Sequence, residues 1–245
     1  MRSDAVLEAR ALTIRRGDRV TLHALDLAVP AGQVYALLGG NGAGKTTTLN
    51  ALLGFVPAAS GQALVAGVDA SRQPELARAH LAYLPENVAL YPYLSGVENL
   101  RYFCMLSDIA LSLAQARALL SATGLAEDAQ SLRVQTYSKG MRQKVGLAIA
   151  KARQARAMLL DEPTSGLDPA AANEFAQSVL QAKRTGMAVL MATHDLFNAI
   201  QVADRIGILR EGRLVVELNA RDVEHAQLER IYLQHARGVL EAPAP

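Results

Sequence analysis

A glycine-rich stretch decides the fold of this chain, and it reads Gly39-Gly40-Asn41-Gly42-Ala43-Gly44-Lys45-Thr46. It fits the pattern G-x-x-x-x-G-K-[ST], whose glycines let backbone N–H groups curl around phosphate oxygens without a clashing Cβ. An apolar segment at residues 33–38 precedes the stretch, and a helical pattern over residues 44–53 follows it. This order predicts a phosphate-binding loop at the positive end of a helix.

The polar side chains of this loop suggest separate roles in nucleotide binding. Lys45 carries its charge on a flexible stem that can reach the β- and γ-phosphates, and the Thr46 hydroxyl is placed to bind Mg²⁺. A chance match is the alternative, and the strand and helix that flank the loop argue against it. The predicted nucleotide-binding residues here are Gly39, Gly40, Asn41, Gly42, Ala43, Gly44, Lys45, Thr46 and Thr47.

A second motif is acidic: an apolar run at residues 157–160 ends in Asp161-Glu162-Pro163. Alone, two carboxylates at a strand end are more often a solvated loop, but downstream of a phosphate-binding loop they predict the other half of a nucleoside triphosphatase. Asp161 would hold Mg²⁺, largely through water. Glu162 would point to the opposite side, where a carboxylate can orient an attacking water or accept its proton.

The composition describes a globular, soluble chain. Of its 245 residues, 51% are hydrophobic, and 25 Lys and Arg against 23 Asp and Glu leave a net charge of +2, without the basic excess of a dedicated nucleic-acid binder. The single cysteine, Cys104, excludes an intrachain disulfide and suits a reducing cytoplasm. The N-terminus lacks the apolar stretch of a secretory signal, and an apolar run such as residues 187–192 is far shorter than the roughly 20 residues needed to span a bilayer.

The strand and helix patterns predict an α/β fold built as one domain over residues 1–245. Alternating residues around the turn at Arg16-Gly17-Asp18 predict an N-terminal antiparallel β portion. Short apolar runs such as residues 187–192 are typical of covered parallel strands. Helix-period segments predict a helical subdomain at about residues 87–155, and two strands and a helix near residues 222–237 close the chain.

Three further motifs follow in order. Tyr137-Ser138-Lys139-Gly140-Met141 looks like a signature sequence, Ser165-Gly166-Leu167-Asp168 looks like a D-loop, and His194 looks like a switch histidine after the next strand. With the two motifs above, the chain resembles the nucleotide-binding subunit of ATP-binding-cassette transporters over essentially its whole length. The resemblance implies a P-loop ATPase that uses ATP and Mg²⁺, with Glu162 and His194 as catalytic residues.

The resemblance also implies partners. Ser138 and the Gly140 N–H would cap a helix that begins near Met141 and offer an anion site. In the family this site serves the ATP of a second subunit, so Ser138, Lys139 and Gly140 would bind nucleotide across a head-to-tail dimer, which we expect to be a homodimer. An integral membrane permease would hold the chain peripherally on the inner face of the cell membrane. No nucleic-acid partner is expected.

Five positions depart from the family pattern, among them Met141, which replaces a glutamine of the signature sequence. Arg16 stands where an aromatic side chain usually stacks on adenine, and a guanidinium can stack on a base as well. Glu86 replaces the usual Q-loop glutamine; its carboxylate can face Mg²⁺, although a solvated loop acid is the alternative. Lys139 and Gly40 replace a glycine and a proline, and Lys139 would place a cation near the partner's phosphates.

An aromatic cluster follows Glu86 and consists of Tyr83, Tyr91, Tyr93, Tyr102 and Phe103. It predicts either a docking surface for the membrane subunit or the small core of the helical subdomain. The sequence of this region is similar to the exporter branch of the family and, within it, to ATPases of nitrous oxide reductase maturation and copper processing. A soluble cassette ATPase that acts on nucleic acid or ribosomes, and a scaffold that binds ATP without hydrolysis, are the competing interpretations.

Overall fold

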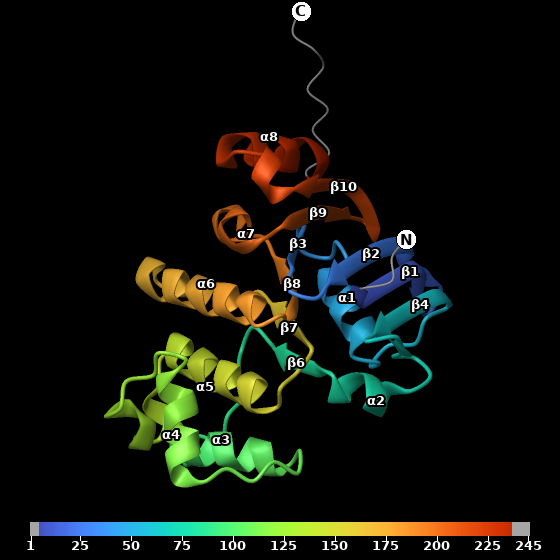
Figure 1. Cartoon of the computed structure of the whole chain (residues 1–245). Helices are drawn as coiled ribbons and strands as arrows, with labels where there is room; N and C mark the ends of the chain where they lie inside the picture. Colours follow the sequence, from blue (N-terminus) through green and yellow to red (C-terminus); the bar gives the residue numbers. More distant parts are fainter. Residues whose placement is uncertain (1–4, 237–245) are drawn as a thin grey trace, which may run out of the picture.

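The computed structural model describes residues 5–236 and shows an α/β fold with two sheets (Figure 1). The larger sheet has the order β10-β9-β3-β8-β7-β6, in which β9 to β6 are parallel and β10 is antiparallel to β9. Helices pack on one of its faces and the smaller sheet, with a helix, on the other, so its central strands are buried and mostly apolar. The strands are β3 (Val34–Leu38), β6 (Leu81–Leu84), β7 (Ala157–Asp161), β8 (Ala188–Thr193), β9 (Arg205–Arg210) and β10 (Arg213–Asn219).

The smaller sheet is antiparallel, as the N-terminal alternation predicts, and has the order β2-β1-β4-β5. Its strands are β1 (Ala5–Arg16), β2 (Arg19–Pro30), β4 (Ser60–Val65) and β5 (Val68–Asp69). Leucines on its inner face, among them Leu7, Leu12 and Leu25, are fully buried in one cluster with side chains of β3, β7 and β8. This cluster forms the main core between the two sheets.

The helices fall into two groups. Helices α1 (Lys45–Leu52), α2 (Pro74–Ala79), α6 (Pro169–Arg184), α7 (Leu196–Val202) and α8 (His225–Ala236) belong to the α/β body. A second buried cluster, which includes Phe175, Val179 and Leu228, packs α6, α7 and α8 against the other face of the large sheet. The closing helix agrees with the predicted residues 222–237, of which Arg237 lies outside the described residues.

The helical part leaves the body after β6 and returns before β7 (Figure 1). It contains α3 (Gly96–Met105), α4 (Leu113–Ser121) and α5 (Lys139–Ala152), with 3-10 turns at Ala129–Ser131 and Val134–Thr136. Ser95 and Ser112 begin α3 and α4 with reciprocal capping boxes. Leu100, Leu120 and Val145 form a separate small core here.

The strand order places three functional loops at one edge of the large sheet. The glycine-rich loop follows β3, the acidic motif ends β7, and His194 follows β8. Strand β8 lies between β3 and β7 in the sheet. Because carboxyl ends of parallel strands open at the same edge, these loops converge. Within residues 5–236, no helix has the length and apolar character to cross a membrane.

Candidate active site

The glycine-rich loop has glycine at both ends because a side chain would not fit at either position. A Cβ on Gly39 would lie 2.6 Å from the Leu209 carbonyl oxygen, and one on Gly44 would lie 2.8 Å from Leu22 Cδ2. Gly42 and Gly44 have φ values of 77° and 112°, which favour glycine. The loop backbone therefore remains open to an anion at the N-terminus of α1.

Lys45 occupies the interior of this loop as the first residue of α1. Its side chain is 8% exposed, and its Nζ donates a hydrogen bond to the Gly39 carbonyl at 2.7 Å. The same ammonium lies 3.1 Å from Glu162 Oε1. Lys45 thus joins the phosphate-binding loop to the acidic motif.

Asp161 and Glu162 have different surroundings although they are adjacent. The Thr46 hydroxyl donates to Asp161 Oδ1 at 3.4 Å. Burial raises the pKa of Asp161; the Thr46 hydrogen bond opposes this shift, and the negative charge of Glu162 adds to it. Glu162 has a φ of 45°, so the chain turns sharply after β7 and aims the two carboxylates apart.

His194 completes the surroundings of Glu162. Its Nδ1 lies 2.8 Å from Glu162 Oε2, and its backbone N–H donates to the same oxygen at 3.3 Å. The Thr193 hydroxyl donates to that oxygen at 3.2 Å. One carboxylate oxygen therefore contacts Lys45 and the other contacts the loop after β8, which holds the carboxylate in one orientation.

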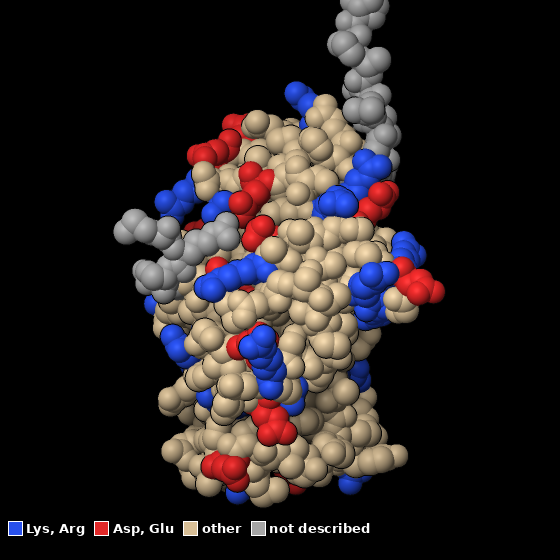
Figure 2. All heavy atoms as spheres, turned by 90° about the vertical axis from the view of Figure 1, so that its right-hand side faces the viewer, with Lys and Arg blue, Asp and Glu red and all other residues tan. Residues whose placement is uncertain are grey.

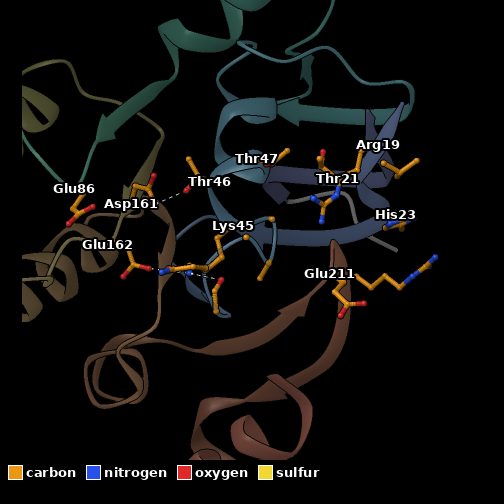
Figure 3. Close-up of a pocket in the computed structure, with 17 residues that line it drawn as sticks. Arg19, Thr21, His23, Lys45, Thr46, Thr47, Glu86, Asp161, Glu162 and Glu211 are labelled. Carbon is orange, nitrogen blue, oxygen red and sulfur yellow. Dashed lines mark hydrogen bonds and ion pairs between the residues drawn. The ribbon is translucent and has the colours of Figure 1, made fainter. Parts of the chain in front are cut away.

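Residues 40–47, Asp161 and Glu162 line an open cleft of about 830 Å³ (Figure 3), and His194 adjoins it through its contact with Glu162. Its far wall consists of residues that the sequence did not single out, from β2 and the β9–β10 turn: Arg19, Val20, Thr21, His23, Glu211 and Arg213. Arg16 is exposed at the end of β1 and is not among the described lining residues, whereas Arg19, its partner across the hairpin, is. The predicted contact of Arg16 with the base stays a prediction.

Glu86 also lines the cleft, next to the acidic motif (Figure 3). Ser138 and Gly140 lie elsewhere, in a separate hollow of about 70 Å³ between α5 and α6. Ser138 caps α5 and accepts a hydrogen bond from the Met141 N–H at 3.2 Å, as predicted, although the helix begins at Lys139. The structure therefore brings the loop, acidic motif and His194 together and leaves Ser138 and Gly140 apart from them.

The oxygen donors in the cleft fit Mg²⁺. The Thr46 hydroxyl and the Asp161 carboxylate are hard ligands of the kind this ion prefers. Across residues 5–236, no group of three or more His, Cys, Asp or Glu is arranged to hold a metal ion by itself. A magnesium ion at Thr46 and Asp161 would therefore take its other ligands from water and phosphate, as is usual for nucleotide-bound magnesium.

A buried parallel strand that runs into a glycine-rich loop and lysine, beside a second strand that ends in carboxylates, defines a P-loop nucleoside triphosphatase. The family model described as "ABC transporter" matches residues 22–165. The chain belongs to this family and is an ATP-binding-cassette ATPase. The narrower likeness to ATPases of nitrous oxide reductase maturation stays a prediction.

Similar proteins agree with this assignment. The uncharacterized ABC transporter ATP-binding protein YhcH of Bacillus subtilis is 34% identical over 218 residues, 89% of this chain and 71% of that protein. The daunorubicin resistance ATP-binding protein DrrA2 of Streptomyces coeruleorubidus is 38% identical over 216 residues, 86% of this chain and 66% of that protein. A solved ATP binding subunit of an ABC transporter superposes with a TM-score of 0.82 at 30% identity, covering 94% of this chain and 98% of the other.

Proposed function

We propose that this chain dimerises on ATP and, by hydrolysing it, drives a separately encoded membrane permease that exports its substrate. The observation that carries the hydrolytic part is the placement of Glu162 between Lys45 and His194, at 3.1 Å and 2.8 Å, at the mouth of the phosphate-binding loop. When the Lys45 ammonium turns to phosphate, the contacts of His194 and Thr193 with the other carboxylate oxygen still orient Glu162 toward a water in line with that phosphate.

In the proposed reaction, the N–H groups of the loop and the Lys45 ammonium hold the triphosphate. Glu162 orients a water and accepts its proton as the water oxygen bonds to the γ-phosphorus. The bond to the β–γ bridging oxygen breaks, and ADP and phosphate leave. His194 keeps the Glu162 carboxylate in position and hydrogen-bonds the γ-phosphate. Thr46 and Asp161 would hold a magnesium ion, which would neutralise part of the triphosphate's charge.

The proposed dimer explains why Ser138 and Gly140 lie outside the cleft. Ser138 is exposed at the N-terminus of a 14-residue helix, where the helix dipole favours an anion. The cleft of the same chain has its own helix N-terminus at Lys45. We therefore assign Ser138 and Gly140 to the nucleotide of the second chain, in a head-to-tail homodimer.

The aromatic cluster without Tyr83, which lies on β6 and packs against the main core, supports a membrane partner. Tyr91 and Tyr93 are 47% and 75% exposed and lie outside the small core of the helical part. Tyr91 packs on Tyr102 at 4.8 Å between ring centroids, and Tyr102 packs on Phe103 at 5.7 Å. Both ring pairs pack edge to face, and an aromatic surface of this kind suits an interface. We propose that it receives the permease and keeps the chain at the inner face of the membrane.

Export is the proposed direction because DrrA2 and a second relative, LnrL of Bacillus subtilis, are named for drug resistance. The alternative function, an ATPase acting on nucleic acid or ribosomes, has less support. On the face shown in Figure 2, basic and acidic side chains are interspersed. A nucleic-acid-binding face would concentrate basic ones.

The test uses the tagged Glu162→Gln variant, purified from detergent-solubilised membranes of its own cells with ATP and Mg²⁺ present throughout. We expect a closed dimer and a polytopic membrane protein in stoichiometric amount, identified by mass. The double variant Glu162→Gln with Lys45→Ala is the matched control, because it should lose the nucleotide that closes the dimer. A soluble dimer without a membrane protein would refute the transporter assignment and favour the nucleic-acid alternative.

A further inference from the structure

Two of the residues that depart from the family pattern face each other across the edge of the cleft. Glu86 lies on the loop after β6, and Lys139 is the first residue of α5. Lys139 Nζ lies 3.8 Å from Glu86 Oε1. Ser165, in the loop after β7, contacts both: its hydroxyl donates to Glu86 Oε1 at 3.3 Å, and its carbonyl accepts from Lys139 Nζ at 2.6 Å. Three segments that are distant in sequence thus form a closed set of contacts.

The position of this set explains why a cation is useful there. Glu86 lines the cleft with Asp161 and Glu162, so three carboxylates gather where a triphosphate would bind. The Lys45 ammonium already serves Glu162 and the Gly39 carbonyl. An uncompensated Glu86 would repel both the neighbouring carboxylates and a polyanionic ligand.

We propose that Lys139 is a positioning residue that acts through Glu86: its ammonium offsets the Glu86 charge, fixes that carboxylate at the mouth of the cleft and ties the N-terminus of α5 to the nucleotide site. Glu86 and Lys139 look like independent departures in the sequence, but they then act together as one charged pair. The inference deepens the proposed function, on which it rests for the identity of the nucleotide.

The test is a double-mutant cycle with Glu86→Gln and Lys139→Gln. Glutamine at Lys139 removes the charge but keeps a donor for the Ser165 carbonyl, and a buried Gln143 side chain still ties α5 to the Pro163 carbonyl. The readout is the dissociation constant of a fluorescent ATP analogue with Mg²⁺. We expect Lys139→Gln to weaken binding about two- to fivefold alone and less than about 1.5-fold in the Glu86→Gln background, as for a partly exposed ion pair.

Two further readouts separate a charge effect from a structural one. Raising ionic strength from about 0.05 M to about 0.5 M should remove most of the coupling between the two residues. Lys139→Arg keeps the positive charge and should keep wild-type affinity for the nucleotide. The matched control is the Arg205–Glu217 pair, 2.6 Å apart on β9 and β10, which lines neither the cleft nor the hollow at Ser138 and Gly140. The cycle of Arg205→Gln and Glu217→Gln should show no coupling in nucleotide affinity.

The outcomes distinguish this inference from the proposed function. Equal effects of Lys139→Gln in the two backgrounds at low salt would overturn the inference while leaving ATP binding intact. If the wild type binds no nucleotide, the proposed function fails, and the same cycle is measured by urea unfolding without nucleotide. Coupling of about two- to fivefold in the unfolding equilibrium would then support the interaction of Lys139 with Glu86. Absence of coupling would refute it.

Discussion

Glu162→Gln should separate nucleotide binding from hydrolysis, because Glu162 both competes for Lys45 and orients water. The variant loses the carboxylate that accepts the proton, a contribution worth about 10²- to 10⁴-fold in kcat, or about 2.7–5.4 kcal/mol in the barrier. Binding should change in the opposite direction. Two unit charges 3.1 Å apart, the separation of Lys45 Nζ and Glu162 Oε1, attract by about 5 kcal/mol at an effective dielectric constant of about 20.

Desolvation offsets most of that attraction, and we take the net value as about 1 kcal/mol. In the wild type, ATP binding breaks the Lys45–Glu162 ion pair as the ammonium turns to phosphate. The variant has no such ion pair to lose. The variant should therefore bind ATP about fivefold more tightly. Phosphate release measures kcat, and a fluorescent ATP analogue measures affinity. Glu75→Gln, the same chemical change at an exposed position on α2, should alter neither by more than about twofold. A kcat loss below about tenfold, or weaker binding, would refute the reasoning.

Three other variants test single contacts. His194→Ala should keep ATP affinity within about twofold of the wild type while lowering kcat about 10²-fold or more, because its Nδ1 contacts the Glu162 carboxylate; a matching loss of binding would contradict this role. Asp161→Asn should abolish turnover yet stabilise the protein. Burial raises the pKa of Asp161, so its contribution to stability is fully present below the unfolded-state pKa and is lost as pH rises through the folded-state value; urea unfolding should show a larger gain at about pH 7 than at about pH 4. Tyr93→Ala should leave unfolding unchanged but weaken capture of the membrane partner, because the side chain is 75% exposed; a drop in stability would assign Tyr93 to the core.

The parts of the site that follow strands were predictable from local pattern. A glycine-rich loop between an apolar strand and a helix has few alternatives, and the structure shows β3, the loop and α1 in that order. The convergence of Lys45, Glu162 and His194 followed from parallel strands ending at one edge. Short elements were harder to see: β6 has only four residues, too few for an apolar run to distinguish a strand from a helix.

The contacts between distant segments were not predictable from pattern. The contact of Arg16 with the base stays a prediction, whereas the place of Arg19 in the cleft, which the pattern did not indicate, depends on the register of the β1–β2 hairpin. Lys139 was expected to face a partner's phosphates, yet its ammonium contacts Ser165 and Glu86 of its own chain. Each of these placements depends on tertiary packing, which the local residue pattern does not contain.

The site also concentrates groups that oppose folding, and the body of the protein compensates for them. Glu162 has left-handed backbone, which costs about 1–2 kcal/mol for a residue other than glycine, and burial disfavours the charged form of Asp161 and raises its pKa. The surrounding strands do the opposite, since the residues of β7 before Asp161 and every residue of the neighbouring β8 are buried. A rigid apolar sheet can therefore hold a strained and charged edge in one geometry. We therefore expect substitutions that remove strain or charge from this edge to stabilise the protein and to slow ATP hydrolysis, as Asp161→Asn should show.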